Sequence, residues 1–348
     1  MTRLLLMGYF GFGNAGDEAI LAAEVAALRA ALRGDTEFVV VSGDPPHTWA
    51  THGLRAVSRT DPLGLLGALR WCDGVVAGGG SLLQDVTSRR PVSFYAGLML
   101  SARALRKPVF VYAQGLGPLR RRFNRVLAGA ALRASTYVAV RDVDSVRLAQ
   151  SLGVHGLELR PDPVLGLGMP APTAGRRSGP RIVVALRPWT GSDGWLPVVR
   201  AALVELARDV EVVLVPFHAG QDVHLARTLA EGVPGAVVIE ADGGFVAASD
   251  AVAGSDAVLG MRLHALVLAA AAGRPFAAVS YDPKVSAFAA LVGQPVVARV
   301  PGPVERDAVV AGVRKALEGP DLAYVDRLAL LRSQATGPAR QIARRLGT

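Results

Sequence analysis

Short runs of apolar residues alternate with helical patterns along the whole chain. In the first half, five runs are predicted to be strands: Leu4–Met7, Phe38–Ser42, Gly74–Ala77, Val109–Ala113 and Tyr137–Val140. The second half continues with Ile182–Leu186, Val210–Pro216, Ala236–Ile239, Ala257–Gly260, Phe276–Ser280 and Val296–Val300. Continuous apolar strands that alternate with helices are typical of parallel sheets covered on both faces. The pattern predicts an α/β protein with two Rossmann-like, doubly wound domains.

The domain boundary is predicted from a break in this pattern. Residues 165–180 are rich in Gly, Pro and Arg and have little periodicity, which indicates a connection between domains. We therefore predict an N-terminal domain over residues 1–168, a linker over 169–180 and a C-terminal domain over 181–348, which ends in one or two helices. Two such domains enclose a cleft, and ligands collect there beyond the carboxyl ends of the strands.

Charge and composition narrow the classes of partner. The chain has a net charge of +9, and 35 of its 38 basic residues are arginine. This balance favours phosphorylated substrates or an acidic membrane face. Nucleic acid is disfavoured, because aromatic residues make up only 6% and the basic residues are scattered. The single Cys72 excludes an internal disulfide, and neither cysteine nor histidine shows metal-ligand spacing.

The sequence predicts a cytoplasmic protein, since the single Cys72 fits a reducing compartment. Mean hydropathy is +0.33, yet no apolar run approaches the roughly 18–20 residues that span a bilayer. The first apolar run breaks at Gly8 and acidic residues follow, so we expect no secretory signal. A basic, apolar-rich surface is consistent with peripheral contact at the inner face of the membrane, although no amphipathic anchor stands out.

The segment from Gly8 to Glu18 follows the first predicted strand and carries a glycine pattern. Gly11, Gly13 and Gly16 fit the G-x-G-x-x-G turn of dinucleotide-binding proteins. Asp17 and Glu18 come next, in the first turn of the predicted helix, where they would repel a pyrophosphate. The loop therefore favours a hydroxylated ligand, although Asp17 could instead be the helix N-cap.

Asn14 belongs to the same loop and is one of only two asparagines in the chain. Asparagine tolerates the left-handed turns that such loops need. A second glycine-rich turn, Gly78-Gly79-Gly80-Ser81, follows the strand Gly74–Ala77 and precedes the helical-looking Leu82–Asp85. It is predicted to present N–H groups to an anion at a helix N-terminus, or to be only a tight turn.

Charged side chains follow several other predicted strands. Arg141 and Asp142 come after Tyr137–Val140, and capping of the next helix is the alternative role for Asp142. In the second half, Arg187 and His218 follow two further strands. The segment Gly260-Met261-Arg262-Leu263-His264-Ala265 places an arginine and a histidine two residues apart at a strand end. Arginine offers a fork for carboxylate or phosphate, and histidine can act as a general acid.

Lys284, in Tyr281-Asp282-Pro283-Lys284-Val285, follows the next strand and is predicted to contact an anion. A solvated surface lysine is the alternative. Together these residues suit a small polyanion and a hydroxylated acceptor. No Ser-His-Asp or Cys-His nucleophile set is recognisable.

In combination, these segments resemble the polysaccharide pyruvyl transferases, and most closely the CsaB type that modifies secondary cell-wall polymers. The resemblance rests on the opening segment Gly8–Ile20, the turn at residues 77–81, Arg141-Asp142, Arg262-Leu263-His264 and Asp282-Pro283-Lys284, in order over nearly the whole chain. It implies a GT-B-like fold and phosphoenolpyruvate as the pyruvyl donor, with no further cofactor or metal.

The resemblance also implies roles for particular residues. Arg262, Arg141 and Lys284 would bind the pyruvyl donor, and His264 would protonate its C3 atom. Asp17 would orient or deprotonate a hydroxyl of the acceptor. The acceptor would be an N-acetylmannosamine-containing, lipid-linked saccharide that receives a 4,6-linked ketal. We place Asn14, Glu18, Gly79, Gly80 and Ser81 at the acceptor or at a phosphate.

Three other functions remain open from the sequence. A GT-B glycosyltransferase with a nucleotide sugar shares the fold and the strand-end arginine and histidine. A nicotinamide dehydrogenase needs an acidic residue about 20 residues past the glycines, and Asp44 comes somewhat late for that role. A non-catalytic sugar- or lipid-binding protein of this fold would be expected to have lost Arg262 or His264.

Overall fold

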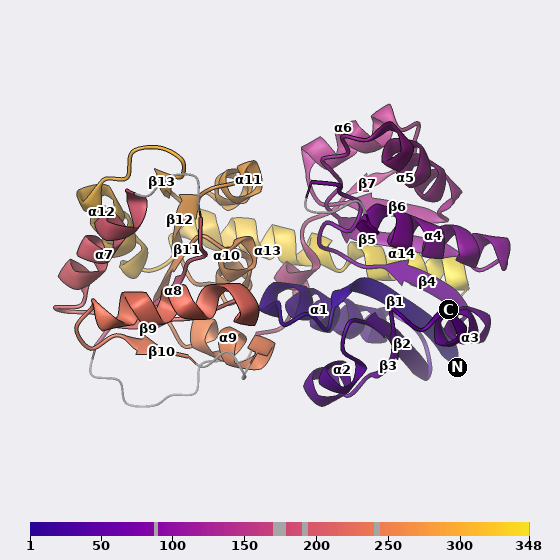
Figure 1. The fold of residues 1–348 in the computed structure, drawn as a ribbon, viewed down its shortest axis with the longest axis horizontal. Coiled ribbons are helices and arrows are strands. Elements are labelled where there is room, and N and C mark those ends of the chain that lie inside the picture. The colour runs from indigo at the N-terminus through magenta and orange to yellow at the C-terminus, as the bar shows by residue number, and fades with distance from the viewer. Residues whose placement is uncertain (87–89, 170–178, 190–193, 240–243, 348) are drawn as a thin grey trace. The chain divides into compact units, whose positions relative to one another are not determined.

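The computed structural model describes residues 1–86, 90–169, 179–189, 194–239 and 244–347. The chain divides into two compact units, each an α/β fold (Figure 1). The first unit contains Met1–Phe12, Asp17–Leu167 and Leu331–Thr348, and the second contains Gly13–Gly16 and Gly168–Leu330. Most of the predicted linker, residues 170–178, lies outside the described residues.

The first unit is built on a seven-stranded parallel sheet with the strand order β3-β2-β1-β4-β5-β6-β7. The central strand β1 pairs on both sides, so that Leu4 lies opposite Phe38 of β2 and Gly74 of β4. The strands are β1 (Thr2–Phe10), β2 (Thr36–Ser42), β3 (Arg55–Ser58), β4 (Gly74–Ala77), β5 (Val109–Gln114), β6 (Tyr137–Val140) and β7 (Glu158–Leu159).

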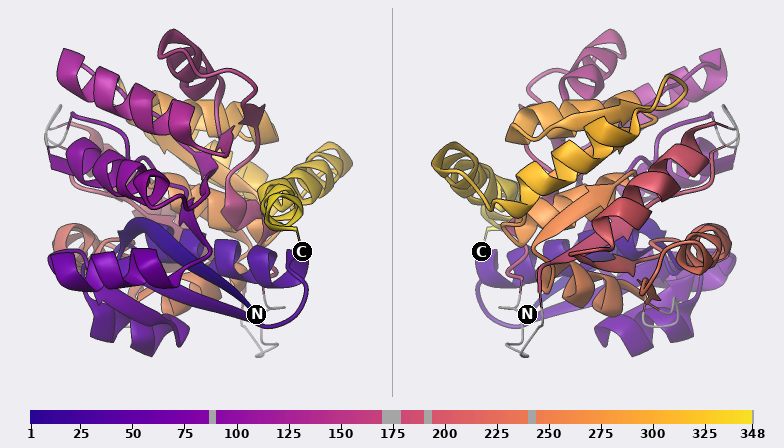
Figure 2. Two further views of the ribbon diagram at one scale, coloured as in Figure 1. Left: turned by 90° about the vertical axis from the view of Figure 1, so that its right-hand side faces the viewer. Right: turned by 90° about the vertical axis from the view of Figure 1, so that its left-hand side faces the viewer.

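Helices cover both faces of this sheet, which is why its central strands are apolar on both sides. The helices are α1 (Ala15–Ala31), α2 (Pro45–His52), α3 (Pro62–Trp71), α4 (Arg90–Ala104), α5 (Arg122–Ala134) and α6 (Val143–Ser151), with a 3-10 turn at Pro163–Gly166. Helix α14 (Gly337–Leu346) packs on β5 and β6, on the face of the sheet opposite α4 and α5 (Figure 2, left). The predicted stripe Leu21, Val25, Leu28 and Leu32 is buried.

The second unit has a six-stranded parallel sheet with the order β10-β9-β8-β11-β12-β13. Its strands are β8 (Arg181–Ala185), β9 (Glu211–Leu214), β10 (Val237–Val238), β11 (Ala257–Gly260), β12 (Phe276–Ser280) and β13 (Val296–Arg299). Its helices are α7 (Trp195–Leu206), α8 (Ala219–Glu231), α9 (Gly244–Ala253), α10 (Leu263–Ala271), α11 (Pro283–Val292) and α12 (Arg306–Leu317); α13 (Leu322–Ala335) begins here and ends in the first unit.

Each sheet has one point where the strand order reverses, and this point locates a ligand site in open α/β sheets. In the first sheet it lies between β1 and β4, and in the second between β8 and β11. The loops that leave these strands are the opening loop and the glycine-rich turn in the first sheet, and the segments at Arg187 and at Arg262-Leu263-His264 in the second.

The two-sheet α/β fold class is confirmed, and some local predictions are wrong. The C-terminal residues Leu331–Thr348 group with the first unit rather than the second. Residues 82–85 form no helix; instead Leu83 makes an isolated parallel bridge with Leu116. The edge strands β3 and β7 were missed.

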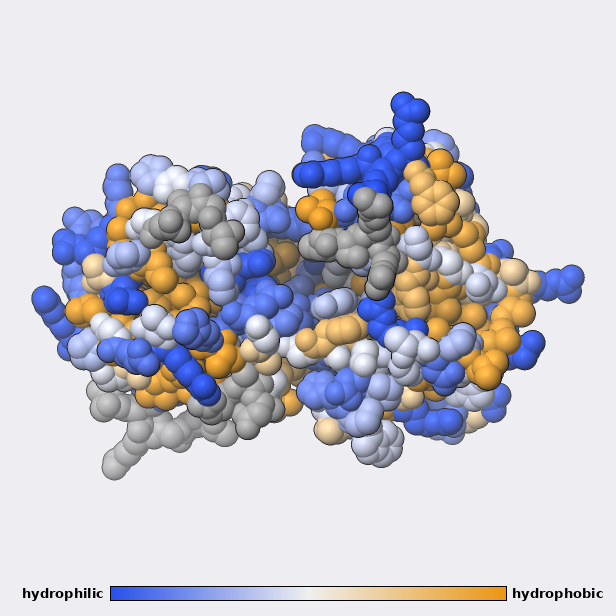
Figure 3. Space-filling model, in the orientation of Figure 1, coloured by the Kyte–Doolittle hydropathy of each residue, from blue (hydrophilic) through white to orange (hydrophobic). Residues whose placement is uncertain are grey.

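No helix among the described residues is long and apolar enough to cross a membrane. On the face shown in Figure 3, hydrophobic and hydrophilic residues are interspersed. Exposed apolar side chains include Phe123 and Val126 of α5, and the exposed Arg120, Arg121 and Arg122 lie next to them along the chain.

Candidate functional site

The opening loop uses its glycines and Glu18 to make a tight turn after β1. Gly11 and Gly13 have positive φ values of 75° and 68°, which favour glycine. The Gly11 N–H donates to Glu18 Oε1 at 2.7 Å, and Glu18 Oε2 lies 2.8 Å from His52 Nε2. Both carboxylate oxygens of Glu18 are thus engaged inside the first unit, and the side chain is buried. Glu18 stabilises the loop, so we no longer place it at a ligand.

Asn14 lies at the start of α1, in the capping position that the sequence offered for Asp17. Its Oδ1 accepts the Gly16 N–H at 3.1 Å, and the helix begins at Ala15. The left-handed backbone that the sequence suggested for Asn14 is wrong. In the described part of the chain, only Arg106 and Ala113 among the non-glycine residues have a positive φ. Asn14 instead pairs with His218 in an antiparallel bridge. The end of the loop, residues 13–16, therefore belongs to the second unit.

Gly16 lies directly against the ring of His264. A Cβ atom at Gly16 would come within 3 Å of Nδ1, Cγ and Cβ of His264. His264 is in the first turn of α10, which follows β11, and is half-buried. The third glycine of the opening pattern is thus required by the packing of His264.

Arg262 is held in place by Asp222 of α8. Arg262 Nε donates to Asp222 Oδ2 at 2.9 Å, and Nη2 donates to Asp222 Oδ1 and to Gln221 Oε1. Asp222 is buried, and its Oδ2 also accepts the backbone N–H of His218 at 3.0 Å. A bidentate pair of this kind fixes the plane of the guanidinium. Nη1 lies outside these contacts with Asp222 and Gln221.

His218 and Lys284 lie at the same edge of the second sheet. His218 precedes α8, and burial together with the charge of Arg262 lowers its pKa below the ordinary value. Lys284 is half-buried in the first turn of α11, after β12, and its N–H donates to the N-cap Asp282 at 2.9 Å. The strands β9, β11 and β12 run parallel, so their carboxyl ends share one edge.

In the first unit, Asp17 lies beside the glycine-rich turn after β4. Its Oδ1 would be 3.1 Å from a Cβ atom at Gly80, and the residue is 8% exposed. The pKa of Tyr9 is raised by burial and by the charge of Asp17. Asp17 and Gly80 therefore face one another across the β1–β4 reversal of the first sheet.

The turn itself rests on a buried carboxyl group. Glu24 Oε1 accepts the Gly79 N–H at 2.6 Å, and the Gly78 N–H donates to the carbonyl of Met7. Glu24 is fully buried, and burial raises its pKa to about 8. The prediction of an anion cradle at a helix N-terminus is wrong here, because residues 82–86 form no helix and the Gly79 N–H is already bound.

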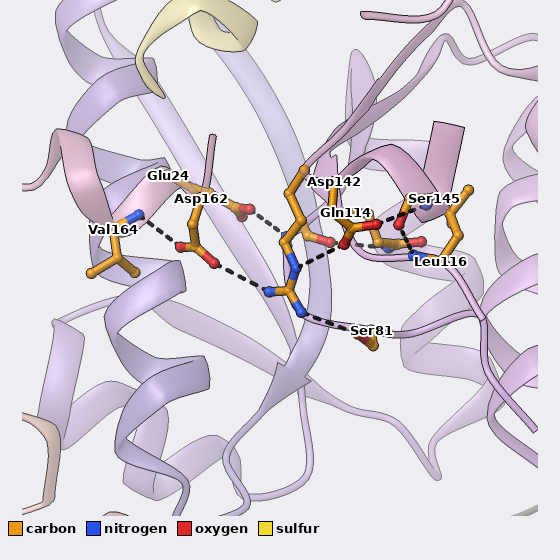
Figure 4. A network of polar contacts seen from close by, with 11 residues as sticks. Glu24, Ser81, Gln114, Leu116, Asp142, Ser145, Asp162 and Val164 are labelled. Carbon is orange, nitrogen blue, oxygen red and sulfur yellow. Dashed lines mark hydrogen bonds and ion pairs between the residues drawn. The ribbon is translucent and has the colours of Figure 1, made fainter. Parts of the chain in front are cut away.

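Ser81, Asp142 and Asp162 belong to a polar network near the end of β6 (Figure 4), and Arg141 takes part in it through two hydrogen bonds. Arg141 Nη1 donates to Asp162 Oδ2 at 3.1 Å, and Nη2 donates to Ser81 Oγ at 3.3 Å. Asp162 Oδ1 also accepts the Val164 N–H, and Asp142 caps α6 by accepting the Ser145 N–H. Arg141 thus has a buried carboxylate partner within the first unit.

Comparisons with known proteins decide the family. A sequence profile of the polysaccharide pyruvyl transferases matches residues 14–283. The chain belongs to this family. It is a transferase that acts in polysaccharide pyruvylation, as the resemblance predicted. No curated protein sequence matches the chain.

Solved structures place this pyruvyl transferase among proteins of the GT-B-like fold. It is similar to the UDP-GlcNAc 2-epimerases of Neisseria meningitidis (13% identity, TM-score 0.64, covering 99% of each chain) and Methanocaldococcus jannaschii (12%, 0.66, covering 100% of this chain and 99% of that one). It is also similar to the spinosyn rhamnosyltransferase SpnG (16% identity, TM-score 0.57, covering 100% of each chain). At these identities the likeness shows the fold alone.

The residues singled out from the sequence fall into two groups in the pyruvyl transferase. The second unit holds Asn14, Arg262, His264 and Lys284, and the first holds Asp17, Glu18, Gly79, Gly80, Ser81 and Arg141. Asp222 was missed, since it lies inside a helix and meets Arg262 only through a long-range contact. Glu24 was also missed. No group of His, Cys, Asp or Glu side chains in the described ranges could hold a metal ion.

Proposed function

We propose that this pyruvyl transferase uses phosphoenolpyruvate to form a cyclic pyruvate ketal on a saccharide. The observation that carries the proposal is the carboxyl edge of the second sheet, where Arg262 is fixed by Asp222 and His264 is seated on Gly16. With Lys284 at the next strand end, this edge presents two cations and a histidine to a small polyanion. A carboxylate and a phosphate suit such a set.

In the proposed reaction, His264 gives a proton to C3 of phosphoenolpyruvate, and C2 acquires oxocarbenium character. A sugar hydroxyl adds to C2 and gives up its proton. The C2–O bond to phosphate then breaks, and a second hydroxyl adds to C2 to close the ketal. One hydroxyl proton restores His264 and the other leaves with phosphate, so one methyl group, one ketal and one phosphate result. Arg262 and Lys284 stabilise the negative charge of the pyruvyl donor.

The acceptor side is proposed from the resemblance and from the position of Asp17. This carboxylate lies beside Gly80 in the first unit, where it would orient or deprotonate a hydroxyl. Asn14, Gly80 and Ser81 are further candidates for contacts with the acceptor or with phosphate, and Arg141 for the pyruvyl donor. We propose a 4,6-linked ketal on an N-acetylmannosamine-type residue of a lipid-linked cell-wall precursor, as in polymers that anchor surface layers.

If the acceptor is lipid-linked, the enzyme must reach it at the inner face of the cytoplasmic membrane. The start of α5 supports this location, because Phe123 and Val126 are each 69% exposed and Arg120, Arg121 and Arg122 stand next to them in sequence. Apolar and basic side chains together favour an anionic lipid surface. Phe123→Ser with Val126→Ser should reduce sedimentation with phosphatidylglycerol vesicles; unchanged binding would remove α5 from this role.

Calorimetry with phosphoenolpyruvate, followed by turnover, tests the pyruvyl transfer. Wild type should bind the donor, and Arg262→Ala should weaken binding. His264→Ala should abolish turnover while binding stays measurable. Full turnover in His264→Ala would refute the acid role, and unchanged affinity in Arg262→Ala would remove that residue from the site.

A nucleotide-sugar glycosyltransferase is the second candidate, and the GT-B-like fold favours it. The epimerase from Neisseria meningitidis, for example, was solved with UDP-GlcNAc bound. Binding and turnover of a UDP-sugar, without binding of phosphoenolpyruvate, would establish this alternative and exclude the proposed reaction.

A further inference from the structure

Arg187 follows β8 in the second unit, and no carboxylate is paired with it among the described residues. It is half-buried, and its Nε is a buried N–H group without a hydrogen-bond partner in the part of the chain that the structure describes. A partly buried cation with an unsatisfied donor is unfavourable unless an anion compensates it. Arg181, at the start of the same strand, shows the contrast, since it is paired with Glu211 at 2.8 Å.

Neighbouring aromatic residues hold Arg187 in one orientation. Its guanidinium carbon lies 4.7 Å from the ring centroid of Tyr281, and its Nη1 donates to Tyr281 Oη at 3.0 Å. Trp189 packs in turn against Tyr281, with the two ring centroids 5.1 Å apart. Arginine stacked on an aromatic ring keeps its remaining N–H groups available for planar recognition of an anion.

His218 adds a second unsatisfied group at the same edge. Its Nδ1 is buried without a partner within the described ranges, although its backbone N–H donates to Asp222. Burial and the positive charges of Arg262 and Arg187 lower the pKa of His218, and the negative charge of Asp222 opposes them. Asp222 is the one carboxylate among these groups. Its oxygens accept hydrogen bonds from the Arg262 guanidinium and from the backbone N–H of His218, so among the described residues it is already engaged without Arg187.

We propose that Arg187 and His218 form the phosphate-binding end of the pyruvyl donor site, next to Arg262. This inference rests on the proposed function. Arg187 leaves β8 and Arg262 leaves β11, which are the two strands at the order reversal of the second sheet. Tyr281 is a positioning residue that sets the plane of Arg187.

The division of contacts follows from the hydrogen bonds already made. Arg262 gives Nε and Nη2 to Asp222, which leaves few of its N–H groups for a ligand. Arg187 donates a hydrogen bond from Nη1 alone, to the neutral hydroxyl of Tyr281. The more highly charged group of phosphoenolpyruvate is its phosphate, and it should bind where the positive charge is least compensated. The carboxylate is then left for Arg262 and Lys284.

Calorimetry with three probes tests the assignment: inorganic phosphate, pyruvate and phosphoenolpyruvate. Arg187→Gln should raise the Kd of phosphate and of phosphoenolpyruvate by about 10- to 100-fold, the range of a lost charge-assisted hydrogen bond. The Kd of pyruvate should change by less than about threefold. His218→Asn should act in the same direction and more weakly. Arg181→Gln removes the same charge from the other end of β8 and should leave all three affinities unchanged.

Tyr281→Phe keeps the stacked ring and removes only the hydroxyl, so it should raise the Kd of phosphate by a smaller factor while the thermal midpoint is kept. The assignment is overturned if Arg187→Gln binds phosphate as wild type does, if it loses pyruvate instead, or if wild type binds no phosphate. If wild type binds phosphate through Arg187 but not phosphoenolpyruvate, the anion site stands and the proposed reaction fails.

Discussion

His264 is seated on Gly16: the imidazole packs against the glycine backbone with no room for a side chain between them. Both residues belong to the second unit, although Gly16 comes at the start of the chain and follows the first strand. The glycine that completes a dinucleotide-binding pattern in the sequence therefore serves a different purpose here. It lets the histidine proposed as general acid approach the start of α1.

Gly16→Ala should displace the His264 ring and lower turnover by about 100-fold, since a misplacement of about 1 Å at a reacting group can cost that much. Alanine favours a helix over glycine, so α1 itself should not be weakened. Turnover and the Kd of phosphoenolpyruvate are measured together, and we expect the Kd to change far less.

Gly67→Ala provides the control, because Gly67 lies within α3 and a Cβ atom there meets nothing within 4 Å. It should leave turnover at the wild-type level and should not lower the thermal midpoint. Wild-type turnover in Gly16→Ala would show that the seat of His264 on Gly16 is not needed for the reaction.

Asp222→Asn should weaken binding of the pyruvyl donor by roughly tenfold, because the neutral amide no longer fixes the Arg262 guanidinium. It should also lower the free energy of unfolding by about 1–3 kcal/mol, since a buried charged hydrogen bond is lost. Calorimetry and denaturant unfolding measure the two effects.

Asp144→Asn breaks an exposed pair with Arg147 and should change neither quantity. If Asp222 acts through Arg262, the double variant with Arg262→Ala should bind the donor no more weakly than Arg262→Ala alone. Additive losses would instead show that Asp222 acts on the ligand independently.

The strands were predictable because most of them are buried on both faces. β4, β6, β11 and β12 have the predicted bounds, and each is a continuous apolar run. The missed strands β3 and β7 are at the two edges of the first sheet. An edge strand has a ladder on one side only, and β3 begins with Arg55 and ends with Ser58, so its apolar signal is weak.

The site was predictable where a residue follows a strand, and it was missed where a residue lies within a helix. Arg262 and His264 come directly after β11, whereas Asp222 is in α8 and its pairing depends on the fold. Glu24 gave a signal that was overlooked. It lies three residues after Leu21 and four before Leu28, on the apolar stripe of α1, where a charged residue indicates a specific buried role.

Gly115→Ala should disturb Arg141 in the first unit. A Cβ atom at Gly115 would lie 2.9 Å from Arg141 Nε and 2.9 Å from Ser81 Oγ, so the guanidinium must move from its present place. If Arg141 contacts the pyruvyl donor, the Kd of phosphoenolpyruvate should rise by about tenfold, as for loss of one charged hydrogen bond. Gly97→Ala, in α4 with nothing within 4 Å, is the matched control. Equal affinity in the two variants would count against a role for Arg141 at the donor.

Glu24→Gln should stabilise the protein, and the gain should grow with pH. Burial raises the pKa of Glu24 to about 8 from an ordinary value of 4.5, so the folded protein holds this proton where the unfolded chain has released it. The folded state then binds more protons than the unfolded state between about pH 4.5 and 8, and wild-type stability falls as pH rises through that window. The slope is at most about 1.4 kcal/mol per pH unit.

Glutamine cannot ionise, and its Oε1 can still accept the Gly79 N–H, so the variant should lose this part of the pH dependence and keep the turn. Urea unfolding at pH 5 and pH 8 measures the difference between variant and wild type, which should be small at pH 5 and largest at pH 8. Glu37→Gln, an exposed position on β2, should show no such increase. A difference for Glu24→Gln that stays constant from pH 5 to pH 8 would mean that Glu24 is already ionised beneath the turn.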